Sequence, residues 1–245
     1  MFNFFQRKNK EFSSGAGLQA DMHSHLIPGI DDGAPDLATS IQLIRALKAM
    51  GYTKLITTPH VMQGVYSNTS ARIKQGLEEV RNELARQSIT MEIEAAAEYF
   101  SDLHFEKLVE ENDLLSFGKE RYVLVEMSFV APSPNLEKVI FNLQTNGYQP
   151  VLAHPERYTY WDITRFTEIK NLGCLLQVNL LSLSGYYGKG VMKAGQHLVQ
   201  AGLADFLGTD LHHQRHADTL RHYHSSSREL MTYLQKYPFR NKELF

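Results

Sequence analysis

The chain contains a single cysteine, Cys174, among its 245 residues. One thiol cannot form an internal disulfide, and it cannot supply the several thiolates of a cysteine-rich zinc site. A cysteine-dependent phosphatase needs arginine six positions after its cysteine, and Leu180 stands there instead, so that mechanism is excluded. Eleven histidines contrast with the one cysteine. Any bound metal must therefore be held mainly by imidazole and carboxylate groups.

The sequence also lacks long apolar runs and a large net charge. No apolar segment approaches the roughly 18 residues of a membrane span. The net charge of −2 argues against a protein whose main task is to bind nucleic acid, so no such partner is expected. Motifs of other hydrolases and phosphate-binding proteins are missing too, namely the Gly-x-Ser-x-Gly elbow, the P-loop and the Asp-x-Asp pair of aspartyl-phosphate enzymes.

The first 17 residues are expected to be a tail and linker, followed by one domain over residues 18–245. Three phenylalanines precede the basic residues of the tail, which reverses the order found in secretory signals, so a cytoplasmic protein is expected. Phenylalanine with lysine and arginine is also compatible with a weak contact between this tail and a membrane surface. Nothing in the sequence indicates an oligomeric state.

From residue 18 onward, short apolar runs alternate with helical patterns. Seven runs predict strands, at 18–23, 54–58, 91–97, 122–126, 150–153, 174–179 and 205–208. Apolar residues spaced three or four apart predict helices over 36–50, 70–87, 135–146, 163–172, 191–201 and 217–234. This alternation is typical of a parallel α/β fold, and a single barrel-like domain is its simplest form. An open doubly wound sheet is the alternative, although no glycine-rich dinucleotide loop is present.

Side chains able to bind metal follow six of the seven predicted strands at their carboxyl ends. They are His23 and His25, His60, Glu98, Glu126, His154, and Asp210 with His212. Parallel α/β barrels have their active sites at this end. A single histidine at a strand end is usually a surface or capping residue, but the same feature on six strands indicates a functional site.

The spacing of two of these pairs has a direct geometric meaning. Side chains alternate along a strand, so residues two apart, such as His23 and His25, project to the same side. Asp210 and His212 repeat this spacing on the last strand. Nitrogen and carboxylate ligands without thiolate suit manganese, iron or zinc. Eight or nine candidates are too many for one ion, which predicts two or three metals sharing a bridging carboxylate.

These residues carry a resemblance to the PHP (polymerase and histidinol phosphatase) superfamily. Within it, the chain resembles the bacterial capsule-associated, metal-dependent protein-tyrosine phosphatases. The matching segments are DMHSHLIPGIDDG at 21–33, TTPH at 57–60, AEY at 97–99, LVEM at 124–127, AHPERY at 153–158 and GTDLH at 208–212. The resemblance implies a distorted seven-stranded βα barrel and a centre of three metals, usually manganese.

The resemblance also implies a ligand set. One metal would be held by His23, His25, Glu98 and Asp210, and a second would share Glu98 and take Glu126 and His154. A third would be held by Asp32, His60 and His212. The neighbouring Asp31 is an alternative to Asp32, and the Ile-Asp-Asp-Gly segment also has the composition of a simple turn.

A phosphatase mechanism with a metal-bound hydroxide follows from the charge of the substrate. Divalent cations neutralise a phosphate dianion, and they lower the pKa of water so that a hydroxide is available at neutral pH for in-line attack. Arg157, three residues after His154, is predicted to contact a phosphoryl oxygen, with a surface salt bridge as the alternative. Arg215 is predicted to play a similar part.

The expected substrate rests on the resemblance alone. It is phosphotyrosine on a bacterial tyrosine kinase of capsule or exopolysaccharide synthesis. A rival hypothesis keeps the fold and hydrolyses histidinol phosphate or another small phosphomonoester. A second rival is an amidohydrolase or a TatD-like nuclease, both of which have a His-x-His pair on the first strand, and a third is a barrel that only binds a partner. The predicted strands ending at Glu98 and Glu126 contain no lysine, which disfavours the amidohydrolase.

Overall fold

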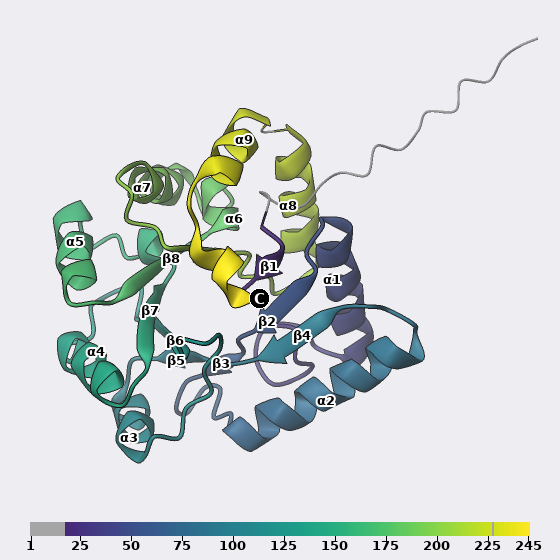
Figure 1. The fold of residues 1–245 in the computed structure, drawn as a ribbon, viewed down its shortest axis with the longest axis horizontal. Coiled ribbons are helices and arrows are strands. Elements are labelled where there is room, and N and C mark those ends of the chain that lie inside the picture. The colour runs from purple at the N-terminus through teal and green to yellow at the C-terminus, as the bar shows by residue number, and fades with distance from the viewer. Residues whose placement is uncertain (1–17, 227) are drawn as a thin grey trace, which may run out of the picture.

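The computed structural model describes residues 18–226 and 228–245, in which helices alternate with parallel strands. The predicted tail of residues 1–17, with its membrane-surface contact, lies outside the described residues. The strands occupy the middle of the molecule and the helices lie around them (Figure 1). None of the described helices is long and apolar enough to cross a membrane. The α/β class predicted from the sequence is confirmed.

The strands form two sheets in which every described ladder is parallel. One sheet has the order β1-β2-β4 and the other β3-β5-β6-β7-β8-β9. The bounds are β1 (Ala20–Asp21), β2 (Lys54–Thr57), β3 (His60–Val61), β4 (Glu92–Ala95), β5 (Glu98–Phe100), β6 (Tyr122–Glu126), β7 (Gln149–Ala153), β8 (Leu175–Asn179) and β9 (Phe206–Gly208). Spatial order follows chain order, whereas a doubly wound sheet reverses its order at a switch point, so the doubly wound fold is wrong.

Two of the predicted strands, 54–58 and 91–97, are each followed by a second short strand that the sequence does not predict, so that β3 follows β2 and β5 follows β4 after a break of two residues. Pro59 lies in the first break and has no backbone N–H to donate to a neighbouring strand. The pairing keeps the same offset across both breaks, with Thr57 opposite Ala95 and His60 opposite Glu98. The described residues therefore contain nine short strands where the sequence predicts seven continuous ones.

Hydrogen bonds link the first strand of one sheet to the last strand of the other. The backbone N–H and the hydroxyl of Thr209 donate to the Asp21 carboxylate at 2.9 and 2.7 Å. Just beyond, the Asp210 N–H donates to the carbonyl of His23 at 2.8 Å. The carboxyl ends of β1 and β9 are therefore adjacent, and the two ligand pairs that the sequence places at opposite ends of the domain are neighbours.

Helices surround these sheets, and polar side chains begin several of them. The bounds are α1 (Leu37–Ala49), α2 (Ser70–Arg86), α3 (Leu103–Glu111), α4 (Leu136–Thr145), α5 (Ile163–Asn171), α6 (Leu180–Leu183), α7 (Lys189–Gln200), α8 (Gln214–Ser226) and α9 (Arg228–Lys236), with short 3₁₀ turns η2 (Pro155–Arg157) and η3 (Arg240–Leu244). Asp36, Thr69, Asp102 and Asp162 cap α1, α2, α3 and α5 by accepting a backbone N–H three residues later. Gly51 follows α1 with a φ of 94°, a left-handed conformation that commonly ends a helix and that glycine adopts readily.

The predicted helices differ from the observed ones in two respects. The helix predicted over 217–234 is two helices, α8 and α9, and α3 and α6 have no predicted counterpart. In α3, which is nine residues long, Phe105 and Val109 are the buried residues. The four residues of α6 directly continue β8, and such a short turn leaves no periodic pattern to detect.

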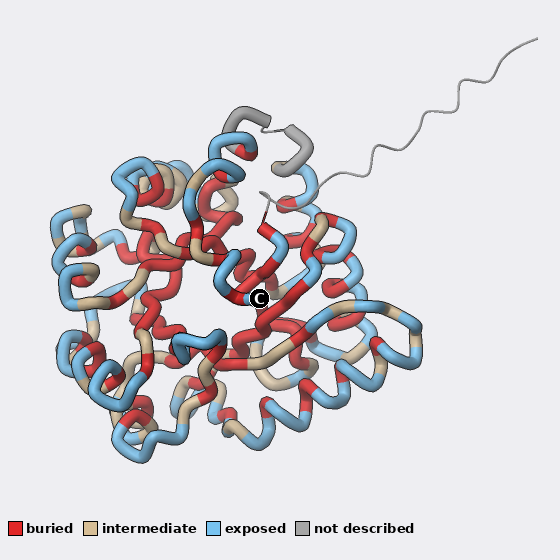
Figure 2. Tube along the Cα trace, in the orientation of Figure 1, coloured by how far each residue is buried: buried red, intermediate tan, exposed pale blue. Residues whose placement is uncertain are grey.

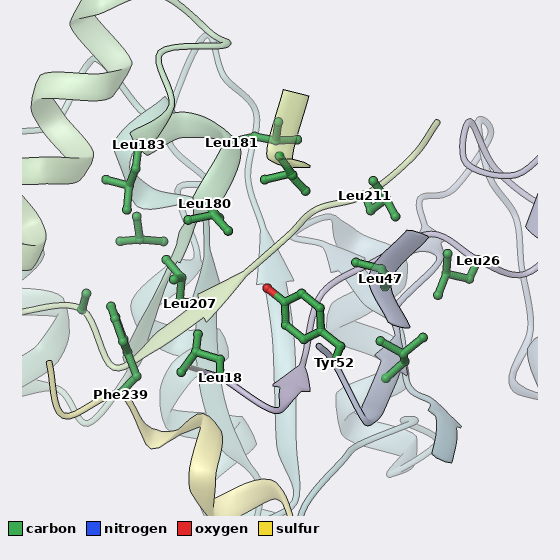
Figure 3. Packing of buried hydrophobic residues seen from close by; sticks show 14 of the residues in the cluster. Leu18, Leu26, Leu47, Tyr52, Leu180, Leu181, Leu183, Leu207, Leu211 and Phe239 are labelled. Carbon is green, nitrogen blue, oxygen red and sulfur yellow. The ribbon is translucent and has the colours of Figure 1, made fainter. Parts of the chain in front are cut away.

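Buried apolar side chains hold the strands in place. Buried residues concentrate in the strands and on the inward faces of the helices (Figure 2). Part of the larger cluster is drawn in Figure 3, where Tyr52 lies among leucines that include Leu18, Leu47 and Leu207. In the second cluster the rings of Tyr122 and Phe206 meet edge to face at 5.1 Å between centroids. This packing fixes the strands whose carboxyl ends carry the predicted ligands.

Candidate metal centre and cavity

The nine predicted metal ligands lie together at the carboxyl ends of the strands and in the loops that follow. Their donor atoms form four overlapping groups, within each of which all atoms lie within 4.8 Å of one another. The groups are His23, His25 and Glu98; His23, His154 and Asp210; His60, Glu98 and Glu126; and His25, Asp32, His60 and His212. The structure thus brings together side chains separated by up to 189 positions in the sequence.

Glu98, the predicted bridging residue, lies at the middle of this cluster and is fully buried. Its Oε1 is 2.8 Å from Nε2 of His154, and its Oε2 is 3.1 Å from Nε2 of His23 and 3.2 Å from Nδ1 of His60. Burial alone would raise the pKa of the Glu98 carboxyl, but His23 and His60 outweigh burial and hold that pKa well below its usual value. Glu98 is therefore an anionic group with several nitrogen neighbours.

His23 and His25 lie side by side, as their spacing predicts, with their Nε2 atoms 3.4 Å apart. Both Nε2 atoms face Glu98 and Asp210, and the His23 Nε2 is 3.3 Å from Oδ1 of Asp210. Burial would lower the pKa of His23, but the carboxylates of Glu98 and Asp210 raise it to about 9. Two imidazoles facing two carboxylates form a site of the kind that divalent transition metals prefer.

The remaining predicted ligands lie nearer the surface. Nδ1 of His60 is 2.9 Å from Oε1 of Glu126, and Oδ1 of Asp32 is 3.5 Å from Nε2 of both His60 and His212. Asp31 instead accepts a hydrogen bond from Nδ1 of His25 at 2.9 Å, on the side away from the cluster. Of the two adjacent aspartates, Asp32 therefore faces the other candidate ligands, and Asp31 orients one of them.

Several donor atoms of the cluster lack well-formed hydrogen bonds. Nδ1 of His60, Oε2 of Glu98 and Oε1 of Glu126 are buried, and each lies about 3 Å from another member of the cluster. None of the three makes a hydrogen bond of acceptable geometry within the described residues. Buried polar atoms without partners are unfavourable in a folded protein. A cluster of imidazole and carboxylate atoms without such partners fits the binding of divalent cations.

The backbone at two candidate ligands is also unusual. His154 has a φ of 33° and Asp210 a φ of 52°, both in the left-handed region that residues other than glycine rarely adopt. His154 directly follows β7, and Asp210 is the second residue after β9, so both lie where the chain turns into the next segment. Strained backbone of this kind concentrates at functional sites, where surrounding structure holds it in place.

A cavity of about 240 Å³ opens above the cluster. Six of the candidate ligands line it, namely Asp32, His60, Glu126, His154, Asp210 and His212, and Phe129, Arg157, Tyr187, His213 and His216 form the rest of its wall. The guanidinium of Arg157 lies between two rings, 4.1 Å from the centroid of Phe129 and 4.6 Å from that of Tyr187, and its Nη1 is 3.4 Å from Oδ2 of Asp210. Arg157 is therefore placed to meet a ligand in this cavity.

Arg215, the other predicted catalytic residue, is not among the residues lining this cavity. Its guanidinium lies 5.5 Å from the centroid of Tyr186, whose ring contacts that of His216. Arg215 lies at the beginning of α8, behind the cavity wall rather than in it.

Sequence reasoning missed several residues that contact the predicted ligands. β8 has no metal ligand at its carboxyl end, but its buried Gln177 and Asn179 hydrogen-bond to His23 and Asp210. Gln177 and Asn179 are two residues apart at a strand end, as His23 and His25 are. This spacing was the signal in the sequence that could have identified them. Phe129 lies in a loop, and only the folded chain brings it against Arg157, opposite Tyr187.

The chain matches the family model described as capsular polysaccharide synthesis, CpsB/CapC, over residues 19–225. All the candidate ligands and both arginines lie within this range. The match covers most of the chain and shows the family.

Several curated relatives carry the name tyrosine-protein phosphatase, among them YwqE and CpsB. YwqE of Bacillus subtilis (strain 168) is 31% identical over 194 residues, which cover 78% of this chain and 76% of that protein. CpsB of Streptococcus pneumoniae is 24% identical over 199 residues, which cover 78% of this chain and 82% of that protein.

A solved structure has the same architecture. It comes from a study of YwqE from Bacillus subtilis and CpsB from Streptococcus pneumoniae, described as metal-dependent tyrosine phosphatases. The TM-score is 0.76 and the sequence identity 28%, over 92% of this chain and 96% of that one.

Proposed function

The chain belongs to the CpsB/CapC family of capsular polysaccharide synthesis, and on that premise we propose that it is a metal-dependent tyrosine-protein phosphatase. The observation that carries the proposal is the convergence of nine imidazole and carboxylate side chains in one cluster, six of which line the same cavity. The chain's relatives are tyrosine-protein phosphatases, and its structural match is metal-dependent. The chain has the side chains that such an enzyme needs, in one place.

The metals of this proposal are two or three divalent cations, manganese first, with iron or zinc able to use the same ligands. His23, His25, Glu98 and Asp210 would hold one ion, and Glu98 with Glu126 and His154 a second. Asp32, His60 and His212 would hold a third. When bound, divalent cations supply charge neutralisation for a phosphate dianion and lower the pKa of water to near neutrality. The buried donor atoms without hydrogen bonds support this assignment.

Arg157 would bind a phosphoryl oxygen from the wall of the cavity. A guanidinium presents several N–H donors in one plane, and hydrogen bonds between charged groups are stronger than neutral ones. The rings of Phe129 and Tyr187 restrict its movement, so little order is lost when it meets the phosphate. Arg215, whose guanidinium lies near the ring of Tyr186 behind the wall, would contribute positive charge to the cavity.

The same rings favour an aromatic phosphate ester. Phe129 is 42% exposed and lines the cavity, so it offers an apolar surface to a phenyl ring that enters beside the phosphate. The phenolate of tyrosine leaves with a pKa near 10, well below that of an alkoxide. It therefore needs less help from an acid, which suits a site rich in metal ligands.

The protein substrate of the proposal is a bacterial tyrosine kinase of capsule or exopolysaccharide synthesis. The support is the family itself, since its model is described by capsular polysaccharide synthesis. A cytoplasmic location is part of the proposal, and it agrees with Cys174 being the only cysteine and buried as a free thiol.

For the fold, we propose that the two sheets are parts of one distorted seven-stranded barrel. The constant pairing offset across the breaks in the strands supports this, as does the parallel bridge between Ser24 and Leu211. On this view β2 with β3 is one strand, β4 with β5 is another, and β1 closes onto the segment after β9.

The proposal is tested by a panel of phosphate esters with manganese-loaded protein. The panel contains a phosphotyrosine peptide, the same peptide with phosphoserine, and histidinol phosphate. The expected result is the highest kcat/KM for the phosphotyrosine peptide, by at least about tenfold. A preference for histidinol phosphate would replace the proposal by the small-molecule hypothesis, and no hydrolysis of any ester would refute both.

A further inference from the structure

β8 supplies none of the proposed ligands, but it places two buried amides directly behind them. Gln177 and Asn179 are both fully buried, and they project to the same side because they are two residues apart on the strand. Primary amides are expensive to bury unless they are hydrogen-bonded. Both make such bonds here, and their partners include two of the proposed metal ligands.

Three side-chain hydrogen bonds run in sequence from one ligand to the other. Nδ1 of His23 lies 2.8 Å from Oε1 of Gln177, and Nε2 of Gln177 lies 2.7 Å from Oδ1 of Asn179. Nδ2 of Asn179 then lies 2.6 Å from Oδ2 of Asp210. The four side chains form one continuous chain, which we call the amide chain.

The carboxylate of Asp210 sets the direction of every bond in the amide chain. An ionised carboxylate only accepts hydrogen bonds, so Asn179 must present its NH₂ group to Asp210 and its oxygen to Gln177. Gln177 must then present its NH₂ group to Asn179, which leaves its oxygen facing His23. An oxygen without a hydrogen can only accept, so His23 must donate from Nδ1.

At each end of the amide chain, one metal-binding atom is left facing the cluster. A proton on Nδ1 leaves Nε2 as the ligand atom of neutral His23, and this Nε2 is 3.1 Å from Glu98. At the other end, Asn179 binds Oδ2 of Asp210, and Oδ1 remains facing the imidazoles at 3.3 Å from His23. One amide pair thereby prepares a nitrogen and an oxygen for the same ion.

Two neighbouring residues indicate that the fold makes room for this arrangement. Gly208 packs against it, since a Cβ atom there would lie 2.8 Å from Nε2 of Gln177 and 2.8 Å from Cβ of His23. The backbone N–H of Asn179 donates to Oε1 of the buried Glu156 at 2.9 Å, which fixes the end of β8. Any larger residue at Gly208 would push the amide away from His23.

We propose that Gln177 and Asn179 are positioning residues of the metal centre, which fix the His23 tautomer and orient Asp210 for a divalent cation. This inference rests on the metal centre of the proposed function. Groups that orient a metal ligand in this way typically contribute about 10–100-fold in metal affinity. His25 has an equivalent orienting partner in Asp31, so each histidine of the pair has its own.

The test is the manganese affinity of purified full-length variants, measured by competition with a chelator. Gln177→Met keeps the side-chain length but removes the acceptor for His23, and its Kd for manganese is expected to rise about 10–100-fold. Gln177→Glu keeps an acceptor for His23 but not a donor for Asn179, so its Kd should fall between those of Gln177→Met and the parent. Gln149→Met is the matched control, because Gln149 lies on the neighbouring β7 and donates only to backbone carbonyls.

Two further measurements separate positioning from a purely structural role. A positioning role predicts that Gln177→Glu, whatever its metal-free midpoint of thermal unfolding, binds manganese more tightly than Gln177→Met, because it keeps the acceptor for Nδ1 of His23. In the zinc-loaded parent protein, the nitrogen-15 spectrum of His23 should show the proton on Nδ1, and this requires no variant to fold. An equal Kd in parent and Gln177→Met, or a proton on Nε2 of His23, would overturn the proposal.

The outcome also distinguishes this inference from the proposed function. A parent protein that binds manganese but does not hydrolyse phosphotyrosine refutes the function and leaves the comparison of Kd values intact. A parent protein that binds no manganese refutes the metal centre and the inference together.

Discussion

The base and the wall of the cavity differ in how the fold holds them. The base, defined as His23, His25, Glu98, His154 and Asp210, comes from strand ends and is at most 2% exposed. The wall, defined as Phe129, Arg157 and Tyr187 with Asp32 and Arg215 beside it, comes from loops, turns and a helix end, and its Asp32 side chain is 54% exposed. The difference suggests a division of tasks, in which the base binds metal and the wall recognises the ester.

The largest expected effect comes from breaking the base at Glu98. Glu98→Gln removes the charge that four imidazoles face. The variant should lose bound metal, and its kcat should fall at least about a thousandfold, because a metal contributes several kcal/mol to such reactions. The measurement is kcat with a phosphotyrosine peptide together with metal content per chain. Glu111→Gln on the exposed face of α3 is the control and should change neither. Full metal content in Glu98→Gln would show that the base is not the metal site.

Arg157 should be the most important residue of the wall. Arg157→Met is expected to lower kcat/KM by about a hundredfold, comparable with the loss of one donor to a developing charge. Metal content should stay at the parent value, which is the difference from Glu98→Gln. Arg157→Lys should recover only part of the activity, since a lysine has no planar group to lie between two rings. A loss of metal in Arg157→Met would contradict the division between base and wall.

Asp32 belongs to the metal ligands by chemistry and to the wall by exposure. Asp32→Asn is expected to remove one ion per chain, the most exposed one, and to lower activity by about tenfold or more. Asp31→Asn should instead keep all ions but bind them less tightly, because Asp31 acts on the cluster through His25. Metal counts after dialysis against a weak chelator compare the two variants. If Asp31→Asn lost an ion and Asp32→Asn did not, Asp31 rather than Asp32 would be the metal ligand.

Phe129 tests how much the aromatic part of the wall contributes. Phe129→Ala removes one of the two rings that hold Arg157, and kcat/KM should fall by about three- to tenfold, as expected for a cation–π contact of about 1 kcal/mol. Phe129→Leu keeps an apolar side chain without the ring. A similar loss in both variants supports the ring contact, whereas full activity in Phe129→Leu would assign the effect to apolar packing.

The smallest effect is expected at Arg215. It lies behind the wall and contacts Tyr186 rather than the cavity. Arg215→Met should lower kcat/KM by about two- to fivefold, in the range of an exposed charge. An effect as large as that of Arg157→Met, in the same peptide assay, would place Arg215 in contact with the substrate.

The contrast between base and wall also explains what could be predicted from the sequence. His23 with His25 and Asp210 with His212 were predictable, because alternation along a strand and the shared direction of parallel strands follow from local sequence. Arg215 illustrates the limit, since its distance from the cavity depends on the start of α8. Phe129 and Tyr187 could not be assigned to Arg157, because loops bring them together through contacts that no local pattern encodes.

The strand breaks and the amide chain mark two other limits. Pro59 directly follows the run that predicts a strand over 54–58, and no apolar run marks the short strand β3 beyond it. Gln177 and Asn179 are ordinary residues in a sequence, and their role depends on the partners that the fold places at either end.

The most direct test of the central claim is the position of the metal. A crystal of manganese-loaded protein, measured with anomalous scattering at the manganese edge, locates each ion without reference to activity. We expect two or three peaks within coordinating distance of His23, His25, Glu98, His154 and Asp210 and their outer neighbours Asp32, His60, Glu126 and His212. Peaks elsewhere, or none at this cluster, would contradict the proposed metal centre.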